Sequence, residues 1–196
     1  HINEVFIPEY RTAEFTKTAM GTTEGQRLHE NPMYHVPFIP FAMAEVAPVV
    51  VGSLRGAADA MFARTQERQG NFSGVKASSR QAPQMRLGKA LAAANAAEIL
   101  LRDLMRSFDQ PLAQQHELQN RINVRLQAGF IADFCLNAVN DIARGIGADG
   151  FRESSSLQMY FRDLNMLAVH AFLDIDNVTE TAGRSALGMP LEDPLI

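Results

Sequence analysis

The 196-residue sequence has little of what several classes of protein require. It has one cysteine, Cys135, which excludes an intrachain disulfide framework and suits a reducing compartment. Cys135 lies inside an apolar helical pattern, which favours a small buried hydrophobic residue. The 22 acidic residues outnumber the 18 basic ones, and a formal net charge of -4 provides no basic field for nucleic acid and no polybasic cluster for a membrane surface.

The sequence also lacks a long apolar run and a leader pattern. No stretch approaches the ~20 apolar residues that a membrane span needs. The first residues show no basic segment followed by an apolar one. We therefore expect a cytoplasmic protein that binds neither nucleic acid nor a membrane.

Motifs of several enzyme classes are missing as well. There is no Gly-x-Ser-x-Gly elbow, no Walker loop and no Cys-x-x-Cys. Residues 145–150, GIGADG, have the spacing G-x-G-x-x-G, but they follow a helical pattern rather than a strand, so they fail as a Rossmann fingerprint. Di-iron bundles use Glu-x-x-His pairs on facing helices, and neither His116 nor His170 belongs to such a pair. We predict no metal site.

What the sequence does have is 46% hydrophobic residues, many of them at helical spacing. Apolar residues recur every three or four positions over 41–69, 80–109 and 111–144, which predicts three amphipathic helices. Pro48 favours a start for the first helix near that residue. The glycines within 145–150 end the third helix.

A fourth helix is predicted over 157–174, LQMYFRDLNMLAVHAFLD, and it continues to near Gly183. Two apolar stripes flank a narrow polar ribbon that contains Asp163 and His170. A helix that is apolar on two sides is typical of a wall between a core and a partner subunit or a site. Four such helices joined by short links predict an all-α, four-helix up-and-down bundle.

The first forty residues follow a different pattern. Residues 1–9, HINEVFIPE, alternate apolar and polar side chains, which predicts a short strand. A single strand is not stable alone, so we expect its partners upstream or in another chain. Residues 10–40 are polar and broken by glycine and proline, and they predict a long loop. We divide the chain into 1–40, the strand and loop, and 41–196, the helical domain.

Three features of the helical domain allow both a structural and a functional interpretation. The glycine link 145–150 is most simply a helix C-cap, and otherwise lets backbone amides approach a phosphate. His170 is most simply a solvated or structural histidine, and otherwise a group that holds or moves a proton near neutral pH. Arg162 and Asp163 are most simply a structural polar pair. The residues alone leave these alternatives open.

The order of GIGADGF and the later Arg162-Asp163 of YFRDLNMLAVHAF resembles the carboxy-terminal helical domain of the acyl-CoA dehydrogenase superfamily. In that family a glutamine-led glycine turn and an Arg-Asp pair occur at the same separation, and here Arg144 stands at the glutamine's position. The opening VFIPE resembles the family's strand that leaves the central β-domain. The resemblance implies that residues 1–40 are the end of such a domain and that the chain is the carboxy-terminal half of a longer protein.

The residues after Arg162-Asp163 distinguish two branches of the superfamily. Aligning on that pair puts Ala171 where acyl-CoA dehydrogenases commonly carry a catalytic glutamate. RDLNMLAVHAFLD followed by GRSALGMPL instead resembles the two-component, flavin-dependent monooxygenases, which include hydroxylases of p-hydroxyphenylacetate and of steroid-derived phenols. NPMYHVPFIPF is similar to that branch too.

This resemblance implies an oxygenase component that hydroxylates a small aromatic substrate through a flavin C4a-hydroperoxide. Reduced FMN or FAD would come from a separate flavin reductase, and molecular oxygen would be the co-substrate. By resemblance, His170 is catalytic and either donates a hydrogen bond to the peroxide or helps to deprotonate a phenol. The resemblance implies flavin contacts by Arg80, Arg144, Gly147, Ala148, Gly150, Arg162 and Asp163, and a substrate mouth lined by Tyr34 and His35.

The resemblance also implies a homotetramer, because superfamily members build flavin sites across subunits, and it implies that this chain is inactive alone. Two alternatives remain. The first is an acyl-CoA dehydrogenase-like flavoprotein whose base lies elsewhere, which an acyl-CoA would reduce anaerobically. The second is a helical oligomerisation module without activity of its own, which would bind no flavin.

Overall fold

The computed structural model describes residues 3–70, 74–193 and 196 of the chain. These residues form helices and turns, with no strand among them. The predicted all-α class is confirmed. The short helices are α1 (Phe15–Ala19), α2 (Glu24–Leu28), α3 (Phe38–Ala44) and α6 (Leu112–His116).

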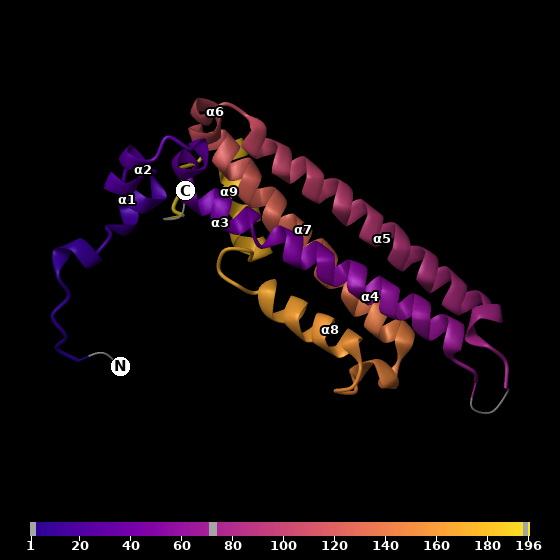
Figure 1. Ribbon diagram of the computed structural model, residues 1–196. Helices are drawn as coiled ribbons and strands as arrows, with labels where there is room; N and C mark the ends of the chain where they lie inside the picture. Colours follow the sequence, from indigo (N-terminus) through magenta and orange to yellow (C-terminus); the bar gives the residue numbers. More distant parts are fainter. Residues whose placement is uncertain (1–2, 71–73, 194–195) are drawn as a thin grey trace.

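Three long helices make up the body of the molecule. They are α4 (Ala47–Glu67), α5 (Gln81–Arg106) and α7 (Leu118–Ile146), and each packs against the other two (Figure 1). Helix α4 begins at Ala47, next to Pro48, as the position of that proline predicted. Two shorter helices complete the bundle: α8 (Ser156–Leu167) packs against α4 and α7, and α9 (Ile175–Ala186) packs against α7.

The core is made of small and branched apolar residues between these helices. Leu54 of α4, Ala94 of α5 and Cys135 of α7 are fully buried. Burial raises the pKa of the Cys135 thiol to about 12, so it is a neutral hydrophobic group, as predicted. A Cβ at Gly56 would lie 2.5 Å from Cζ of Tyr160, so α8 approaches α4 closely only because residue 56 is glycine.

The N-terminal predictions are partly wrong. Residues 3–8 form no strand, because the part of the chain that the structure describes contains no strand to pair with them; residues 1 and 2 lie outside it. The predicted loop over 10–40 contains α1, α2, a 3₁₀ turn (Pro32–His35) and the start of α3. Together these form an arm that reaches away from the bundle (Figure 1).

Two of the four predicted long helices are broken. The third is interrupted at Glu117, whose extended backbone (φ -59°, ψ 135°) separates α6 from α7. The fourth ends at Leu167 and resumes as α9, where the Asp174 side chain caps the helix by accepting a hydrogen bond from the Asp176 amide at 3.0 Å. Residues 168–174 form a link between α8 and α9, and a bundle of four long, uninterrupted helices is therefore not observed.

One stretch of the described chain, Phe38–Glu67, is long and apolar enough to cross a membrane on length and composition. This differs from the expectation that no run approaches such a length. Half of its most apolar window is buried against the other helices of the bundle.

Candidate functional site

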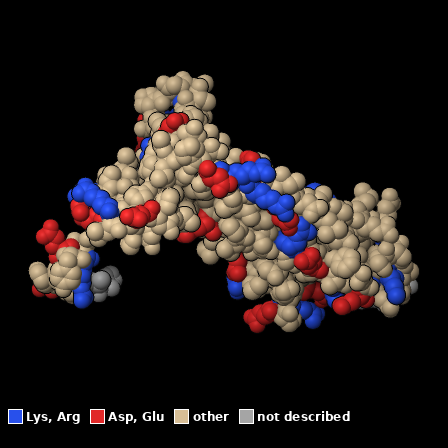
Figure 2. Space-filling model, turned by 45° about the horizontal axis from the view of Figure 1, so that its top comes forward, with Lys and Arg blue, Asp and Glu red and all other residues tan. Residues whose placement is uncertain are grey.

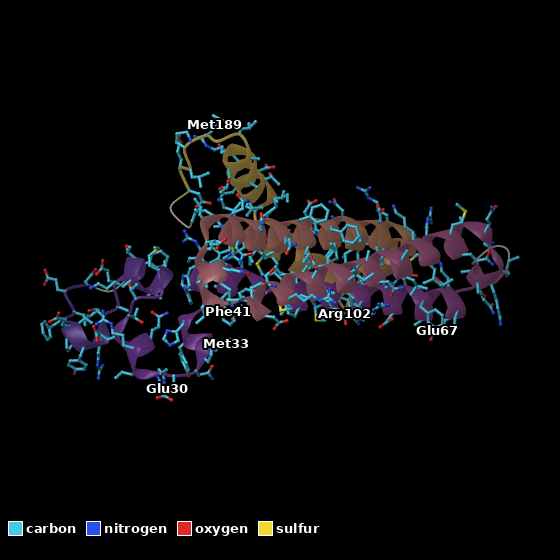
Figure 3. The ribbon with its side chains drawn as sticks, turned by 90° about the horizontal axis from the view of Figure 1, so that it is seen from above. Glu30, Met33, Phe41, Glu67, Arg102 and Met189 are labelled. Carbon is cyan, nitrogen blue, oxygen red and sulfur yellow. The ribbon has the colours of Figure 1, made fainter. Side chains whose placement is uncertain are left out.

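The predicted site residues lie at several separate places on the molecule. The glycine turn 147–150 lies at the end of the bundle where α4 finishes at Glu67, and Tyr34 and His35 lie in the arm beside Met33, at the opposite end (Figure 3). His170 lies in the link 168–174, which packs beside the middle of α7. The chain therefore does not bring all predicted residues into one pocket.

The glycine turn has a clear structural role. Gly147 ends α7 with a positive φ of 81°, and its amide donates to the backbone oxygen of Ala143 at 3.1 Å, which is a helix C-cap. Gly150 is buried, and a Cβ there would lie 2.8 Å from Cδ2 of Leu157. Ala148 lies between them and is exposed. Gly147 is therefore needed for its positive φ, and Gly150 is needed to pack the turn against the start of α8.

Arginines at the end of α4 hold this turn. Arg64 forms an ion pair with Asp149, and Arg68 Nη1 donates to the backbone oxygen of Ile146 at 2.8 Å. Arg152 Nε lies 3.4 Å from Asp149 Oδ1. Nε of Arg64 is buried and has no hydrogen-bond partner among the described residues. Sequence reasoning missed Arg64 and Arg68, because they lie about 80 residues before the turn and carry no local motif.

A cavity of about 510 Å³ opens beside the turn. Its polar lining comes from Arg64 and Arg152, from Glu67 and Asp149, and from Ser154–Ser156 at the N-terminus of α8. Arg64 and Arg152 both pair with Asp149. Their remaining N–H groups and the positive end of the α8 dipole are donors that suit an anionic group such as a phosphate.

Arg144 faces a different cavity, of about 280 Å³, between α5 and α7. Arg86 and Lys89 of α5 and Asp141 of α7 line it too. Lys89 and Asp141 form an ion pair, and the hydrogen bond from Lys89 lowers the pKa of the Asp141 carboxyl. Arg80 is the exposed N-cap of α5. Arg86 and Lys89, which were not predicted, therefore line the same cavity as the predicted Arg144.

The link 168–174 fixes the backbone of His170. The His170 amide donates to the oxygen of Leu167 at 3.1 Å, and its own carbonyl accepts hydrogen bonds from the amides of Leu173 at 2.8 Å and Asp174 at 3.0 Å. The imidazole is exposed, and its Nδ1 lies 3.3 Å from the amide nitrogen of Phe172. Ala171 is also exposed and offers no carboxylate.

Arg162 and Asp163 pair with each other on α8. Arg162 Nε lies 3.2 Å from Asp163 Oδ1; the Arg162 side chain is exposed and that of Asp163 is half-buried. Beside them, Asn165 donates to Asn140 Oδ1 of α7 at 3.3 Å. The pair is available to a ligand or a second subunit, and among the described residues it has no buried partner.

Tyr34 and His35 belong to a cluster of rings in the arm. The Tyr34 ring stacks on His29 with centroids 4.2 Å apart. His35 Nε2 lies 2.9 Å from the backbone oxygen of His29, and His116 Nε2 of α6 lies 2.7 Å from the backbone oxygen of His35. These bonds attach the arm to the end of the bundle.

The described residues hold no group of three or more His, Cys, Asp or Glu side chains arranged for a metal ion. Acidic and basic side chains are interspersed on the face shown in Figure 2, with uncharged surface between them. That face therefore carries no field of a single sign.

Comparison with known proteins identifies the family of this chain. Residues 44–175 match the family described as acyl-CoA dehydrogenase, C-terminal domain. The chain is 55% identical over 195 residues to the pigment production hydroxylase of Rhodococcus sp. (strain ATCC 21145), covering 100% of this chain and 50% of that protein. It is 24% identical to the p-hydroxyphenylacetate 3-hydroxylase, oxygenase component, of Acinetobacter baumannii, covering 98% of this chain and 46% of that protein. The chain thus spans about half the length of these curated relatives.

A solved structure shares the fold. XiaF from Streptomyces sp., in complex with FADH2 and glycerol, superposes with a TM-score of 0.82 at 24% sequence identity, covering 98% of this chain and 49% of that chain. At this identity the likeness shows the architecture alone.

Proposed function

Because the chain belongs to the acyl-CoA dehydrogenase C-terminal domain family, we propose that it is the helical half of the oxygenase component of a two-component, flavin-dependent monooxygenase. The observation that carries this proposal is the 55% identity, over the whole chain, with a pigment production hydroxylase. In this proposal residues 41–196 are the helical domain, and residues 1–40 are the end of a central β-domain with its connecting segment.

The proposed reaction is hydroxylation of a small aromatic substrate in the cytoplasm. A relative named as an oxygenase component and a fold neighbour with FADH2 bound support a reduced flavin, FMN or FAD, delivered by a separate flavin reductase. The bound reduced flavin would supply the activation of molecular oxygen. The chain's own residues would bind the flavin, orient the substrate and handle a proton.

The glycine-turn cavity fits the phosphate end of a flavin. Arg64 offers a buried Nε donor that no described residue uses, and Arg152 and the α8 N-terminus add positive potential. Gly147, Ala148 and Gly150 would let the backbone approach the phosphates. Arg80 and Arg144 would add basic groups at the same end of the bundle.

His170 would contact the substrate or the reacting part of the flavin. The twelve residues of α8 separate His170 from the glycine turn, which is about 18 Å at 1.5 Å per residue. That separation fits a flavin site shared between subunits of a homotetramer, with Arg162 and Asp163 on the α8 surface between its two ends. The exposed apolar side chains of Met159, Met166 and Val169 also fit contact with another subunit. Tyr34 and His35 would line the substrate mouth from the arm.

Replacement of His170 by alanine in the full-length enzyme tests the catalytic role. We expect the oxidation of the bound reduced flavin, followed by stopped-flow absorbance under oxygen, to become uncoupled from product formation. Ile99→Ala, a change at an exposed side chain of α5 away from the predicted site residues, is the control and should keep the wild-type product yield. A wild-type rate and yield in His170→Ala would refute the role given to His170.

Two further measurements separate the alternatives. Anaerobic reduction of the flavin by an acyl-CoA would favour a dehydrogenase, although Ala171 supplies no base for it. Flavin titration of this 196-residue chain, with its assembly state followed by light scattering, tests whether the chain is only an oligomerisation module. Assembly without any flavin binding, by this chain and by the full-length protein, would favour an oligomerisation module.

A further inference from the structure

The hydrogen bond between Phe172 and His170 determines which ring nitrogen of the neutral imidazole carries the proton. The backbone amide of Phe172 can only donate, so His170 Nδ1, 3.3 Å away, must accept. A neutral imidazole has one donor nitrogen and one acceptor nitrogen. The acceptor is therefore used inside the link, and the proton lies on Nε2.

The link holds this arrangement in place. The His170 carbonyl accepts from two successive amides, at 2.8 and 3.0 Å, which fixes the peptide that carries the ring. Leu173 is 2% exposed, so the link is anchored in the core three residues later. The His170 ring meets the Phe172 ring edge to face, with centroids 5.3 Å apart. Both the backbone and the ring of Phe172 thus orient the imidazole.

The other ring nitrogen is open. His170 is exposed, and no described residue makes a hydrogen bond to Nε2. An imidazole fixed in this way offers a donor N–H and no lone pair on the outward nitrogen. To accept a proton there, the ring would first have to change tautomer and give up the bond from the Phe172 amide.

We propose that His170 acts as a hydrogen-bond donor through Nε2–H, not as a base, and that the Phe172 backbone amide is the positioning group that sets this tautomer. This inference rests on the proposed function. It chooses between the two roles that the family resemblance implies for His170, a hydrogen-bond donor and a base. The partner of Nε2–H is an oxygen atom of the reactants, such as a phenolic oxygen that gains negative charge during hydroxylation. A fixed donor aimed at developing charge lowers the barrier without reorganisation.

Side-chain amides distinguish a donor from a base, because an amide donates a hydrogen bond but does not accept a proton near neutral pH. Glutamine places its amide near the position of Nε2, and asparagine places the same group near Nδ1. We compare His170→Gln, His170→Asn and His170→Ala in the full-length holoenzyme, measuring the rate and yield of hydroxylated product. We expect His170→Ala and His170→Asn to lose about 10²-fold in rate and His170→Gln to stay within about tenfold of the wild type.

Each outcome has one meaning. If glutamine is as slow as alanine, a hydrogen-bond donor at this position does not suffice, and the inference fails while the proposed function stands. If alanine itself keeps the wild-type rate and yield, the proposed role of His170 fails instead. A slow alanine variant rescued by glutamine and not by asparagine supports the donor.

The tautomer can be measured without flavin or turnover. In this chain labelled with ¹⁵N-histidine, the His170 signals are assigned by their loss in His170→Gln. We expect one neutral tautomer with the proton on Nε2, rather than the mixture of both tautomers, with Nε2–H in excess, that an unconstrained histidine side chain shows. A signal from protonated Nδ1 in the neutral form would overturn the positioning role of the Phe172 amide.

Discussion

At the scale of single residues, Arg125 is the most deeply buried charged side chain described, with 1% of its surface exposed. Its Nη2 lies 2.6 Å from Asp193 Oδ2, and its Nε donates to the sulfur of Met43 at 3.3 Å. Thr181 adds a hydrogen bond to Asp193 at 3.3 Å. A guanidinium stays charged in a protein, so this one depends on the carboxylate of Asp193.

Asp193→Asn should therefore destabilise the fold strongly. The change leaves Arg125 buried without a counter-charge, and we expect the free energy of unfolding in urea to fall by about 3–5 kcal/mol. The neighbouring Glu192→Gln removes the partner of Arg184 in an ion pair whose carboxylate is 78% exposed. It should cost no more than about 1 kcal/mol. Equal losses for the two variants would contradict this account.

Single residues also mark where prediction from sequence ends. Periodicity correctly placed Leu54, Met61 and Leu104 in the core, because each lies on the apolar side of its own helix. It gave no sign that Arg125 is buried, because the partner that makes this possible lies about 70 residues later. Arg64 and Arg68 beside the glycine turn were missed for the same reason.

At the scale of elements, the break between α8 and α9 was not predicted. Residues 168–174, AVHAFLD, contain no glycine or proline, and they continue the apolar pattern of the helix before them. The break is set by packing, since the link lies against α7 at Gly129. A Cβ on Gly129 would lie 2.5 Å from Cγ2 of Val178 and 3.4 Å from the backbone oxygen of Leu173.

Gly129→Ala should push the link and α9 away from α7. Overpacking of this kind costs about 1–3 kcal/mol, which outweighs the gain of up to about 1 kcal/mol in helix propensity. We expect a lower melting temperature and faster amide exchange over 168–178. In contrast, Gly52→Ala in α4 meets no atom within 4 Å and should stabilise the chain slightly. A stabilised Gly129→Ala variant would mean that α9 does not pack against α7 at this position.

At the scale of the whole molecule, the arm and the bundle differ in how much they bury. The 3₁₀ turn Glu9–Arg11 and helices α1 and α2 contain no buried residue, and Phe6 and Tyr10 are 86% and 81% exposed. Burial begins at Val36, just before α3. The bundle therefore contains nearly all of the hydrophobic core.

A chain that begins at Phe15 should unfold like the complete one. Its free energy of unfolding should change by less than about 0.5 kcal/mol, because the removed residues that the structure describes contribute no core. A chain that begins at Phe38 loses buried Val36 and the bond between His116 and His35, and it should be less stable by about 2 kcal/mol. Urea titrations of the three chains test both values. A large loss on removing only the first fourteen residues would show that the arm supports the bundle.

The ion pair between Arg125 and Asp193 also has a consequence for the order of events during synthesis. Arg125 leaves the ribosome about 70 residues before Asp193, which at about 5–20 residues per second is an interval of about 4–14 s. Throughout that interval α7 can be helical, but burying its arginine would leave a charge without a partner. The nascent helices should therefore stay loosely associated until the last turn of α9 and the segment after it emerge, and only then close into the native bundle.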